Sequence, residues 1–481
     1  MNNTICEIVT SIRGQDKINV HGYIMVKDKN RNDLYYWCCE KRNVLECNGR
    51  AVTKLVEGQH LLQKISDHNH AAEASRVEVI NTINSLKERA KETNELPAQI
   101  IQTVITSSTS EVHPYLPSRD ALHQSINRTR SSELPIEPDS LEDLVVPEDL
   151  TRTLDGTNFL IKDSVIDQDR ILLFTTIANV RHLEQSSFWI MDGTFKAVPT
   201  IFKQLYTIHG SVGGSENSRI MPLVYALMSR KSERCYRRLF QDLVDFGEEY
   251  DIHLQPQFIL TDFEQAAINA VHTEFQGVRN KGCFFHLSQS VYRKVQNSGL
   301  SIQYGTDENF SLLIRHIPAL AFLPPEDIPA AFDELKEHIP EEANPIVQWF
   351  EDNYVHGRIR RALRDGNVTR TQPLFPPDFW SVVDNIDYAF PRTQNSVEAW
   401  NRRWGVLVGL AHLGVFKIIK EIQKEQCRVQ LDIESILRGD PRPSRRRQTV
   451  EHETRIQTVF NDRNNRQLMD FLRGIAHNVS F

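Results

Sequence analysis

Two short apolar runs of this chain each lead directly into an aspartate. The run 187–191 (SFWIM) precedes Asp192, and the run 257–261 (QFILT) precedes Asp262. Continuous apolar runs of this length are typical of buried β-strands, and Gly193 permits a sharp exit from the first. In open α/β sheets, functional residues gather at the carboxyl ends of the strands. Both aspartates are therefore predicted to lie where an α/β protein carries its chemistry.

The surrounding residues predict the other elements of such a sheet. Further elements are expected as extended runs at 202–208 and 220–227, a helix at 232–247, a helix opening at 263–267 and a short strand at 282–285. With the two runs above, the order is strand, strand, strand, helix, strand, helix and strand. This is the succession of elements in the ribonuclease H fold.

Each acidic residue also has a purely structural interpretation. An aspartate after a strand is often a turn residue or a helix cap. A third acid, Glu398, follows Asn395 in the sequence Asn-Ser-Val-Glu, which resembles a capping box whose glutamate bonds back to the first residue. Taken alone, this pattern favours a cap for Glu398.

The motifs around the three acids occur in a distinctive order. They are DGTFK at 192–196, QLYTIHG at 204–210, PLVYAL at 222–227, TDFE at 261–264, Cys283-x-x-His286 and Asn395-x-x-Glu398-x-Trp400-Asn401. In this order they resemble the Mutator-like element (MULE) transposases over about residues 155–430. The resemblance implies an α/β, ribonuclease H-like catalytic core with the triad Asp192, Asp262 and Glu398, and an all-α insertion at about 290–394. Apolar residues recur at helical spacing there, at Phe310, Leu313 and Ile317, then Phe332, Leu335 and Ile339, then Val347 and Phe350.

Three carboxylates predict a site for Mg²⁺ or Mn²⁺, which prefer oxygen ligands. In a two-ion site, one ion lowers the pKa of an attacking water or DNA 3′-hydroxyl and the other stabilises the leaving oxygen. We expect Asp192 to be the ligand shared by both ions, with Asp262 and Glu398 each completing one site. Cys283 and His286 have half of a zinc-site spacing, and a buried Cys beside a His at a helix start explains them equally well. The resemblance implies only that this pair lies near the site.

A second group of motifs lies near the amino end. They are Arg13-Gly14, Gly22-Tyr23, Tyr36-Trp37-Cys38-Cys39, Cys47-Asn48-Gly49-Arg50 and His68-Asn69-His70. They resemble a FLYWCH zinc finger over about residues 8–70, although Ile8 and Val9 stand where that family has an aromatic residue.

The alternating runs of this segment predict a small sheet, in which residues two apart share a face. His68 and His70 would then address one ion, and Cys39 would face it while Cys38 points away. The expected structural zinc ligands are Cys39, Cys47, His68 and His70. By spacing alone, a core cysteine pair beside a His-rich turn is an equal alternative.

Composition and cysteine usage fit an ordinary globular protein of several domains. The 481 residues are 40% apolar and 25% charged, which predicts two to four domains. Seven unevenly placed cysteines argue against a disulfide framework, and no apolar run approaches the roughly 20 residues of a membrane span. We expect an intracellular protein, and a DNA substrate would place it in the nucleus. Residues 71–132 show helical spacing interrupted by prolines, which predicts a helical linker domain.

The net charge of −7 is unusual for a protein that binds DNA, but the charge is unevenly distributed. Residues 133–149 contain seven acids and no base, which predicts an acidic, solvated linker over 133–150. Residues 399–481 contain fifteen Lys and Arg against nine Asp and Glu. Within them, a basic C-terminal tail is expected over 431–481. The run 443–447 fits nuclear import, phosphate binding or a solvated tail, and the arginines of the insertion (Arg360, Arg361, Arg364 and Arg370) fit DNA contact or a solvated helix.

Two classes of function remain open from the sequence. In the first, the chain is a DNA transposase that binds double-stranded transposon ends and target DNA, acts as a homo-oligomer, and cleaves and transfers strands. In the second, it is a domesticated, non-catalytic DNA-binding transcriptional regulator. Retention of all three carboxylates favours the first. Candidate DNA-contacting residues are Arg50, Lys196, Arg445, Arg446 and Arg447.

Overall fold

The computed structural model describes residues 4–9, 17–93, 95–131, 135–195, 197–214, 216–362, 368–409, 413–442, 444 and 446–479. The chain divides into two compact units, Met1–Ile136 and Glu137–Phe481, which are described separately. None of the helices in the described part of the chain has both the length and the apolar character of a membrane span.

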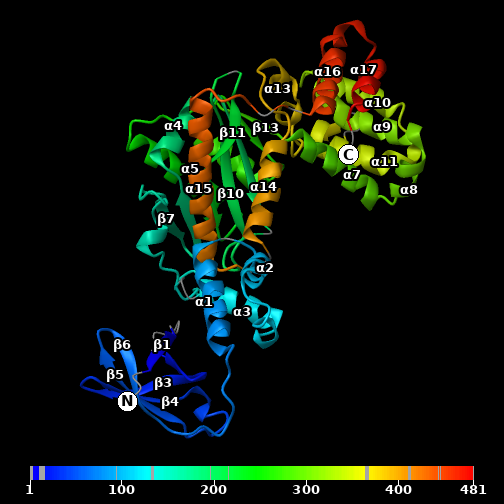
Figure 1. The fold of residues 1–481 in the computed structure, drawn as a ribbon. Coiled ribbons are helices and arrows are strands. Elements are labelled where there is room, and N and C mark those ends of the chain that lie inside the picture. Colours follow the sequence, from blue (N-terminus) through cyan, green and yellow to red (C-terminus); the bar gives the residue numbers. More distant parts are fainter. Residues whose placement is uncertain are drawn as a thin grey trace. The chain divides into compact units, whose positions relative to one another are not determined.

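The first unit begins with a closed six-stranded barrel (Figure 1). Its strands are β1 (Ile5–Val9), β2 (Lys17–Val20), β3 (Tyr23–Arg31), β4 (Leu34–Cys39), β5 (Arg50–Val56) and β6 (Gln59–Ile65), with a short 3-10 turn η1 (Glu40–Arg42) after β4. Strand β1 pairs with both β2 and β6, so the predicted small sheet closes on itself and leaves no edge. Buried Trp37 fills the interior, and its indole N–H donates to Thr53 Oγ1 at 2.8 Å. Val9 of β1 packs against Ile24 of β3.

Three helices follow the barrel, as the apolar spacing predicts. They are α1 (Arg76–Glu92), α2 (Pro97–Ser107) and α3 (Arg119–Ser131), with a 3-10 turn η2 (His113–Tyr115) before α3. Leu86, Ile101 and Ile126 belong to the small core that the three helices share. Pro97 begins α2, where its missing N–H costs nothing.

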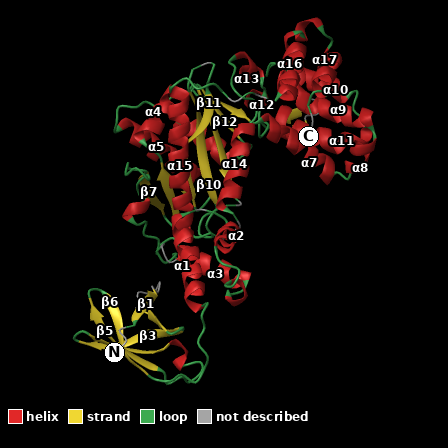
Figure 2. Ribbon diagram, viewed as in Figure 1, coloured by secondary structure: helices red, strands yellow, loops and turns green. Residues whose placement is uncertain are grey.

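The second unit is a mixed α/β structure built on a seven-stranded sheet (Figure 2). Its strands are β7 (Leu160–Ile166), β8 (Asp169–Phe174), β9 (Phe188–Thr194), β10 (Gln204–Val212), β11 (Arg219–Met228), β12 (Phe258–Thr261) and β13 (Arg279–Gly282). The order across the sheet is β13-β12-β9-β10-β11-β8-β7, with β9, β12 and β13 parallel and the remaining pairs antiparallel.

The predicted strands and helices around the two aspartates are confirmed, with three corrections. Strand β9 continues through Thr194 and does not end sharply at Gly193. The last strand ends at Gly282, and the residues expected in strand at 284–285 open a helix. Strands β7 and β8, which extend the sheet at one edge, were not predicted.

Helices cover both faces of this sheet. They are α4 (Ile177–Gln185), α5 (Glu233–Glu248), α6 (Gln265–Glu274), α14 (Asn395–Val408) and α15 (Val415–Leu437). Thr207 pairs with both Asp192 and Tyr225, so these three side chains share one face. Trp400 of α14 contacts Tyr225 on that face, whereas α5 contacts the opposite face through Tyr206. Figure 1 shows α14 and α15 lying along the strands. Asp192 therefore faces α14.

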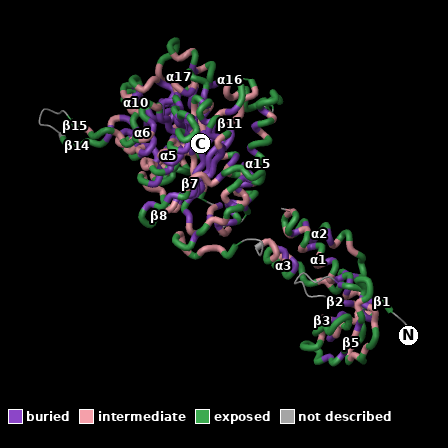
Figure 3. The backbone as a smooth tube through the Cα atoms, turned by 90° about the vertical axis from the view of Figure 1, so that its left-hand side faces the viewer, coloured by how far each residue is buried: buried purple, intermediate pink, exposed green. Residues whose placement is uncertain are grey.

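The insertion between β13 and α14 contains helices and one hairpin. The elements are α7 (Phe284–Asn297), α8 (Ser301–Thr306), α9 (Glu308–Ala319), η4 (Leu320–Phe322), α10 (Ile328–Lys336), η5 (Glu341–Ala343), α11 (Asn344–Phe350), a π-helical turn η6 (Glu351–Val355), β14 (Ile359–Ala362), β15 (Val368–Arg370), α12 (Pro377–Trp380) and α13 (Val383–Asp387). The expectation of an all-α insertion is wrong in this respect, because β14 and β15 form a two-stranded antiparallel sheet. Figure 3 shows this hairpin standing out from the rest of residues 137–481.

The C-terminal residues are folded, which corrects the expectation of a tail. Helix α15 runs across the expected boundary at 430 and packs on the sheet through Val429 and Ile433. Two helices and a turn follow it, α16 (Arg447–Asn461), η7 (Arg463–Asn465) and α17 (Leu468–Ala476). Phe460 and Phe471 join the hydrophobic core of the insertion.

The acidic segment is also packed, so its expectation as a solvated linker is corrected. Leu144 is buried, as is Leu150 in the short turn η3 (Glu148–Leu150). The Glu137 carboxylate accepts a hydrogen bond from Val415 N at 2.6 Å and so caps the start of α15. An acid at a helix start is favoured by the helix dipole. Glu133 lies outside the described residues.

Candidate functional site

Four metal-ligating side chains meet at one end of the barrel. Cys39 ends β4, Cys47 lies in the loop before β5, and His68 and His70 follow the end of β6. One ligand atom of each lies within 4.8 Å of the others. His68 and His70 do address the same site, as predicted. The reason given for this was wrong, because neither residue lies in a strand.

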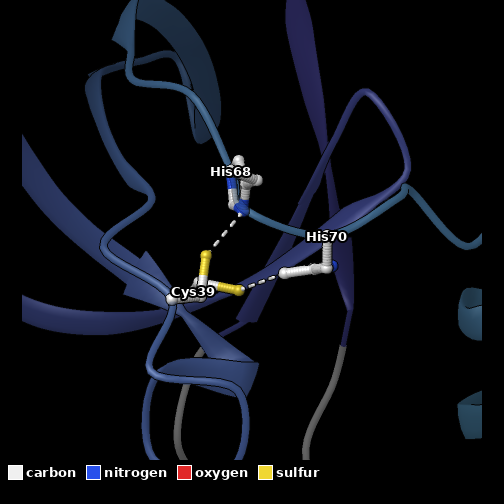
Figure 4. A group of neighbouring side chains, drawn as sticks. Cys39, His68 and His70 are labelled. Atoms are coloured by element: carbon white, nitrogen blue, oxygen red, sulfur yellow. Dashed lines mark hydrogen bonds between the residues drawn. The ribbon is translucent and has the colours of Figure 1, made fainter.

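The four ligand atoms form two Cys–His pairs. Cys39 Sγ lies 3.2 Å from His70 Nε2, and Cys47 Sγ lies 3.4 Å from His68 Nδ1. Figure 4 shows the side chains of Cys39, His68 and His70 pointing toward one another. His70 Nδ1 contacts the carbonyl oxygen of Ala71 at 2.9 Å, which leaves Nε2 to face the sulfur. A carbonyl on the outer nitrogen is the usual support of a metal-bound imidazole.

The His68 ring is held between two flat surfaces. Tyr23 stacks on it with ring centroids 3.8 Å apart and an interplanar angle of 11°. On the other side is Gly49, where a Cβ atom would lie 2.4 Å from His68 Cε1. Only glycine fits at this position without moving the ring.

The protonation states of this group suit zinc. Burial raises the pKa of Cys47, but the backbone N–H groups of Asn69 and Gly49, together with Cys39 and Arg50, outweigh burial and lower that pKa. Burial, then His70, lowers the pKa of His68, which favours the neutral imidazole. Burial raises the pKa of Cys39, and the neighbouring Cys47 raises it further, because two adjacent thiolates repel each other. A cation bound between them would remove this repulsion. The four residues therefore fit a Cys₂His₂ site for Zn²⁺.

Asp192 lies near the carboxyl end of β9, and Asp262 directly follows the end of β12, the adjacent parallel strand. Strands β9 and β12 pair in register through Leu260 and Ile190, two residues before Asp262 and Asp192 respectively. Neighbouring strands are about 4.8 Å apart, so the two carboxylates project from the same level of the sheet. Neither is a helix cap, because β9 continues past Asp192 and α6 has Glu264 at its N-cap.

Glu398 joins them from the first turn of α14. The capping-box interpretation is wrong: Gln394 is the N-cap, so Glu398 is the fourth helical residue and no side-chain cap bond forms. Its Oε1 atom is buried and has no hydrogen-bond partner among the described residues.

Asp192 is electrostatically coupled to both of the other acids. Burial, then the charge of Asp262 and to a smaller extent that of Glu398, raise the pKa of Asp192 to about 7, against the hydrogen bonds from Gly193 and Asn401. Burial also raises the pKa of Asp262, which the ammonium of Lys231 lowers. Among the described residues, the three acids do not form a group whose ligand atoms all lie within 4.8 Å of one another. The three carboxylates need not be that close to one another in a site with two ions, because ions about 3.5–4 Å apart can be bound by different ligands.

Two amide side chains that were not predicted as site residues organise this region. Asn401 Nδ2 donates to Asp192 Oδ2 at 2.8 Å, while Asn401 Oδ1 is buried without a partner among the described residues. Gln394 Nε2 donates to the carbonyl of Met191 at 3.0 Å and reaches that of Leu260 at 3.5 Å. Gln394 thus ties α14 to both strands just before their aspartates. Asn401 lay inside a motif noted in the sequence, but nothing local indicated its partner.

Cys283 and His286 lie beside Glu398 at the start of α7. Cys283 is the N-cap residue and is fully buried, and burial raises its pKa to about 12. Burial lowers the pKa of His286, and the nearby Glu398 raises it. Within the described residues, neither belongs to a group of three or more metal ligands. The pair is near the site, as the resemblance implies, and forms no zinc site of its own within the described part of the chain.

The candidate DNA-contacting residues are dispersed. Arg50 is exposed on β5, and its Nη1 donates to Gly49 O at 3.2 Å, next to the zinc ligands. Arg446 and Arg447 are exposed at the start of α16, where Arg447 Nε bonds Glu451 at 2.7 Å. The residues named from the sequence that lie outside the described ranges are Arg13, Gly14, Lys196, Arg364, Pro443 and Arg445.

The hairpin of β14 and β15 carries three of the insertion arginines for which the sequence predicted DNA contact or a solvated helix. Arg360 and Arg361 are exposed on β14, so they do not solvate a helix. Arg370 on β15 donates to the buried Glu351 at 2.8 Å.

Comparison with known families agrees with both resemblances. Residues 188–290 match the MULE transposase domain, a range that contains Asp192 and Asp262 and ends before Glu398. Residues 8–70 match the FLYWCH zinc finger domain, which contains the four zinc ligands. No curated protein matches the chain. The chain carries an N-terminal FLYWCH zinc finger domain and a MULE transposase domain, and these two domains support a DNA-binding protein of the transposase type.

Proposed function

We propose that this chain is a DNA transposase that cleaves and joins DNA ends with two divalent metal ions held by Asp192, Asp262 and Glu398. One observation carries the proposal. Asp192 of β9 is coupled to Asp262, which directly follows β12, and to Glu398 of α14, and two buried oxygens of this group, Glu398 Oε1 and Asn401 Oδ1, have no hydrogen-bond partner among the described residues. Unpaired buried oxygens are costly unless a cation compensates them.

The donor set fits Mg²⁺ or Mn²⁺. All the candidate ligand atoms are oxygens, which these hard cations prefer. Asp192 is electrostatically coupled to both other acids, which supports its role as the shared ligand. When bound, such ions would lower the pKa of the attacking water or 3′-hydroxyl and stabilise the leaving oxygen.

The protein's own side chains prepare this site. The Asn401 amide fixes the orientation of the Asp192 carboxylate, and Gln394 fixes the helix that carries Glu398. Lys231 lies near Asp262 and pairs with Glu264 at 2.5 Å. Its side chain is 34% exposed, which allows the ammonium to meet a DNA phosphate at the rim of the site.

The fold supports a ribonuclease H-like core as part of the same proposal. The five strands from β9 to β13 and the helices α5 and α6 occur in the predicted chain order. We further propose that the zinc finger domain contributes to recognition of double-stranded transposon ends. A nuclear location and a homo-oligomer follow from this proposal, because a transposase must bring two DNA ends together.

The decisive test is metal-dependent cleavage of duplex DNA that carries the genomic sequences flanking this coding region. The full chain should nick or cut it only with Mg²⁺ or Mn²⁺, and Asp192→Asn should abolish cleavage while retaining DNA binding. The matched control is Asp245→Asn, which changes an exposed aspartate on α5 and should cut normally.

Metal binding itself provides a second readout. Mn²⁺ titrated into the full chain should bind, and Asp192→Asn should weaken that binding. DNA binding without cleavage and without Mn²⁺ binding would instead support the non-catalytic regulator. Undiminished cutting by Asp192→Asn would refute the assignment of the site.

A further inference from the structure

A pocket of about 380 Å³ is lined in part by Asn395, the first residue of the helix that carries Glu398. Its walls come from the start of α7, the segment that leads into α14, and α16. Its volume is within the roughly 300–1,000 Å³ typical of small-ligand sites.

The lining of this pocket combines aromatic and neutral polar side chains. Phe284, Phe285 and Ile456 provide apolar surface, while Asn395 and Thr449 provide hydrogen-bonding groups. Such a combination suits a flat ring with polar edges, because one surface stacks and the other reads donors and acceptors.

A polar atom in this pocket lacks a partner. Ser288 is only 3% exposed and lines the pocket, yet its Oγ makes no hydrogen bond to any described residue. The charge of Arg392 in the same lining is already neutralised by two hydrogen bonds to Glu453, at 2.7 and 2.8 Å. The pocket therefore offers hydrogen bonds to a neutral group and little attraction for an anion.

The position of the pocket links it to DNA. Phe285 precedes His286, which is electrostatically coupled to Glu398, and Asn395 lies in the same helical turn as Glu398. Exposed Arg446, at the N-cap of α16 and two residues before the lining, can meet a phosphate. A ligand in the pocket would thus contact Phe285 and Asn395, which are chain neighbours of His286 and Glu398, and Arg446 could bind a phosphate attached to that ligand.

We propose that this pocket binds one unpaired base of the DNA strand that is cut, turned out of the duplex. A base inside a duplex cannot reach such a pocket, so the nucleotide must leave the stack. The inference rests on the proposed function, because it assumes DNA at the three carboxylates. It adds a contact that favours DNA with a distorted or unpaired nucleotide.

The test uses the full chain carrying Asp192→Asn without divalent metal, so that it is independent of cleavage. Two duplexes of equal sequence are compared, one fully paired and one with a single bulged 5-iodouracil. Because a base stacked on an aromatic side chain adds to affinity, the bulged duplex should bind about tenfold more tightly. Irradiation should crosslink the iodouracil to Phe285 or to His452, which also lines the pocket.

Variants on α16 and α7 provide the controls. Thr449→Trp should fill the pocket and remove the preference for the bulged duplex, whereas Thr454→Trp, exposed on the same helix and absent from the lining, should keep it. Ser288→Ala breaks no hydrogen bond between described residues and should lower the preference about fivefold. Equal affinities for the two duplexes, crosslinks only outside the pocket, or equal effects of the two tryptophans would each overturn the inference. Failure here with metal-dependent cleavage intact would leave the proposed function standing.

Discussion

The replacement Gly49→Ala should release zinc from the barrel by displacing one ligand. The new Cβ atom would lie 2.4, 2.5 and 2.7 Å from Cε1, Nδ1 and Nε2 of His68. Ordinary contact begins at 3.4 Å, so the ring must retreat by about 1 Å. Tyr23 stacks on the opposite side with ring centroids 3.8 Å apart, which leaves no room in that direction.

A displacement of about 1 Å is large compared with a Zn–N bond of about 2.0–2.1 Å. Changes in the support of a zinc ligand usually cost about 10–100-fold in metal affinity. We expect a loss in that range for Gly49→Ala, together with roughly 1–3 kcal/mol of overpacking. The measurement is competition for zinc with a chromogenic chelator, using the full chain.

Gly58→Ala is the matched control in the same barrel. Gly58 has φ +80°, and no heavy atom lies within 4 Å of the place that a Cβ atom would take, so its replacement strains the backbone without touching a ligand. It should lower stability by about 1–2 kcal/mol and leave zinc affinity unchanged. Unchanged zinc affinity in Gly49→Ala, or an equal loss in Gly58→Ala, would refute the reasoning.

Three further predictions concern the metals and the core. Asn401→Leu removes the hydrogen bond to Asp192 and should weaken Mn²⁺ binding and metal-dependent cleavage about 10–100-fold, with metal-free DNA affinity unchanged. Chelation of zinc should unfold the barrel, seen as loss of protease resistance over residues 17–70, while residues 137–481 stay resistant. Burial lowers the pKa of His209 to about 3, against about 6.5 when unfolded, so protons bind only the unfolded state as pH falls between these values. Stability present above pH 6.5 should fall by about 2 kcal/mol at pH 5, and His209→Gln should abolish this component of the shift in melting temperature between pH 7 and pH 5.

Most of the strands and helices around the two aspartates have apolar patterns and were predicted from the sequence, whereas β13, which polar contacts hold, was not. Strand β13 (Arg279–Gly282) contains no apolar side chain, so no hydrophobic pattern marks it. It is held by polar contacts instead: Asn280 Nδ2 donates to Ile259 O at 3.0 Å, and Lys281 pairs with Asp384 at 2.7 Å. These partners lie far away in the chain, so a local pattern could not reveal them.

The same limit applies to the charged segments. The acidic run 133–149 was predicted from its charge to be solvated. Glu137 in this run instead caps α15 by accepting a hydrogen bond from Val415, which is 278 residues further along the chain. The arginines near 445 indicated a tail, yet the helices around them bury Phe460 and Phe471 against the insertion. Net charge describes the solvent-facing side of a segment and says little about the apolar residues between the charges.

The position of Glu398 shows why its local sequence was misleading. A capping box needs the helix to begin after Asn395, but Gln394 is buried and bonded to both strands, and the helix begins one residue earlier. That shift frees the Glu398 carboxylate from a capping role. Whether Glu398 is a cap or a site residue therefore depends on the hydrogen bonds from Gln394 to the carbonyls of residues 191 and 260. The local sequence around Glu398 does not contain these two residues.

The helix that carries Glu398 is also fixed at a second point. Glu425 of α15 is only 3% exposed, and it accepts hydrogen bonds from Trp400 Nε1 and Arg403 Nη1, both at 2.8 Å. Breaking such a buried charge pair costs roughly 3–5 kcal/mol, because the remaining charge stays uncompensated. The bonds of Gln394 fix α14 before Glu398, and the bonds of Trp400 and Arg403 to Glu425 fix it after Glu398. A carboxylate more than one hundred residues from its partners in sequence is thus positioned by rigid elements, as a metal site requires. The insertion can therefore vary in length without moving the carboxylate, provided that Gln394 and Glu425 keep their contacts.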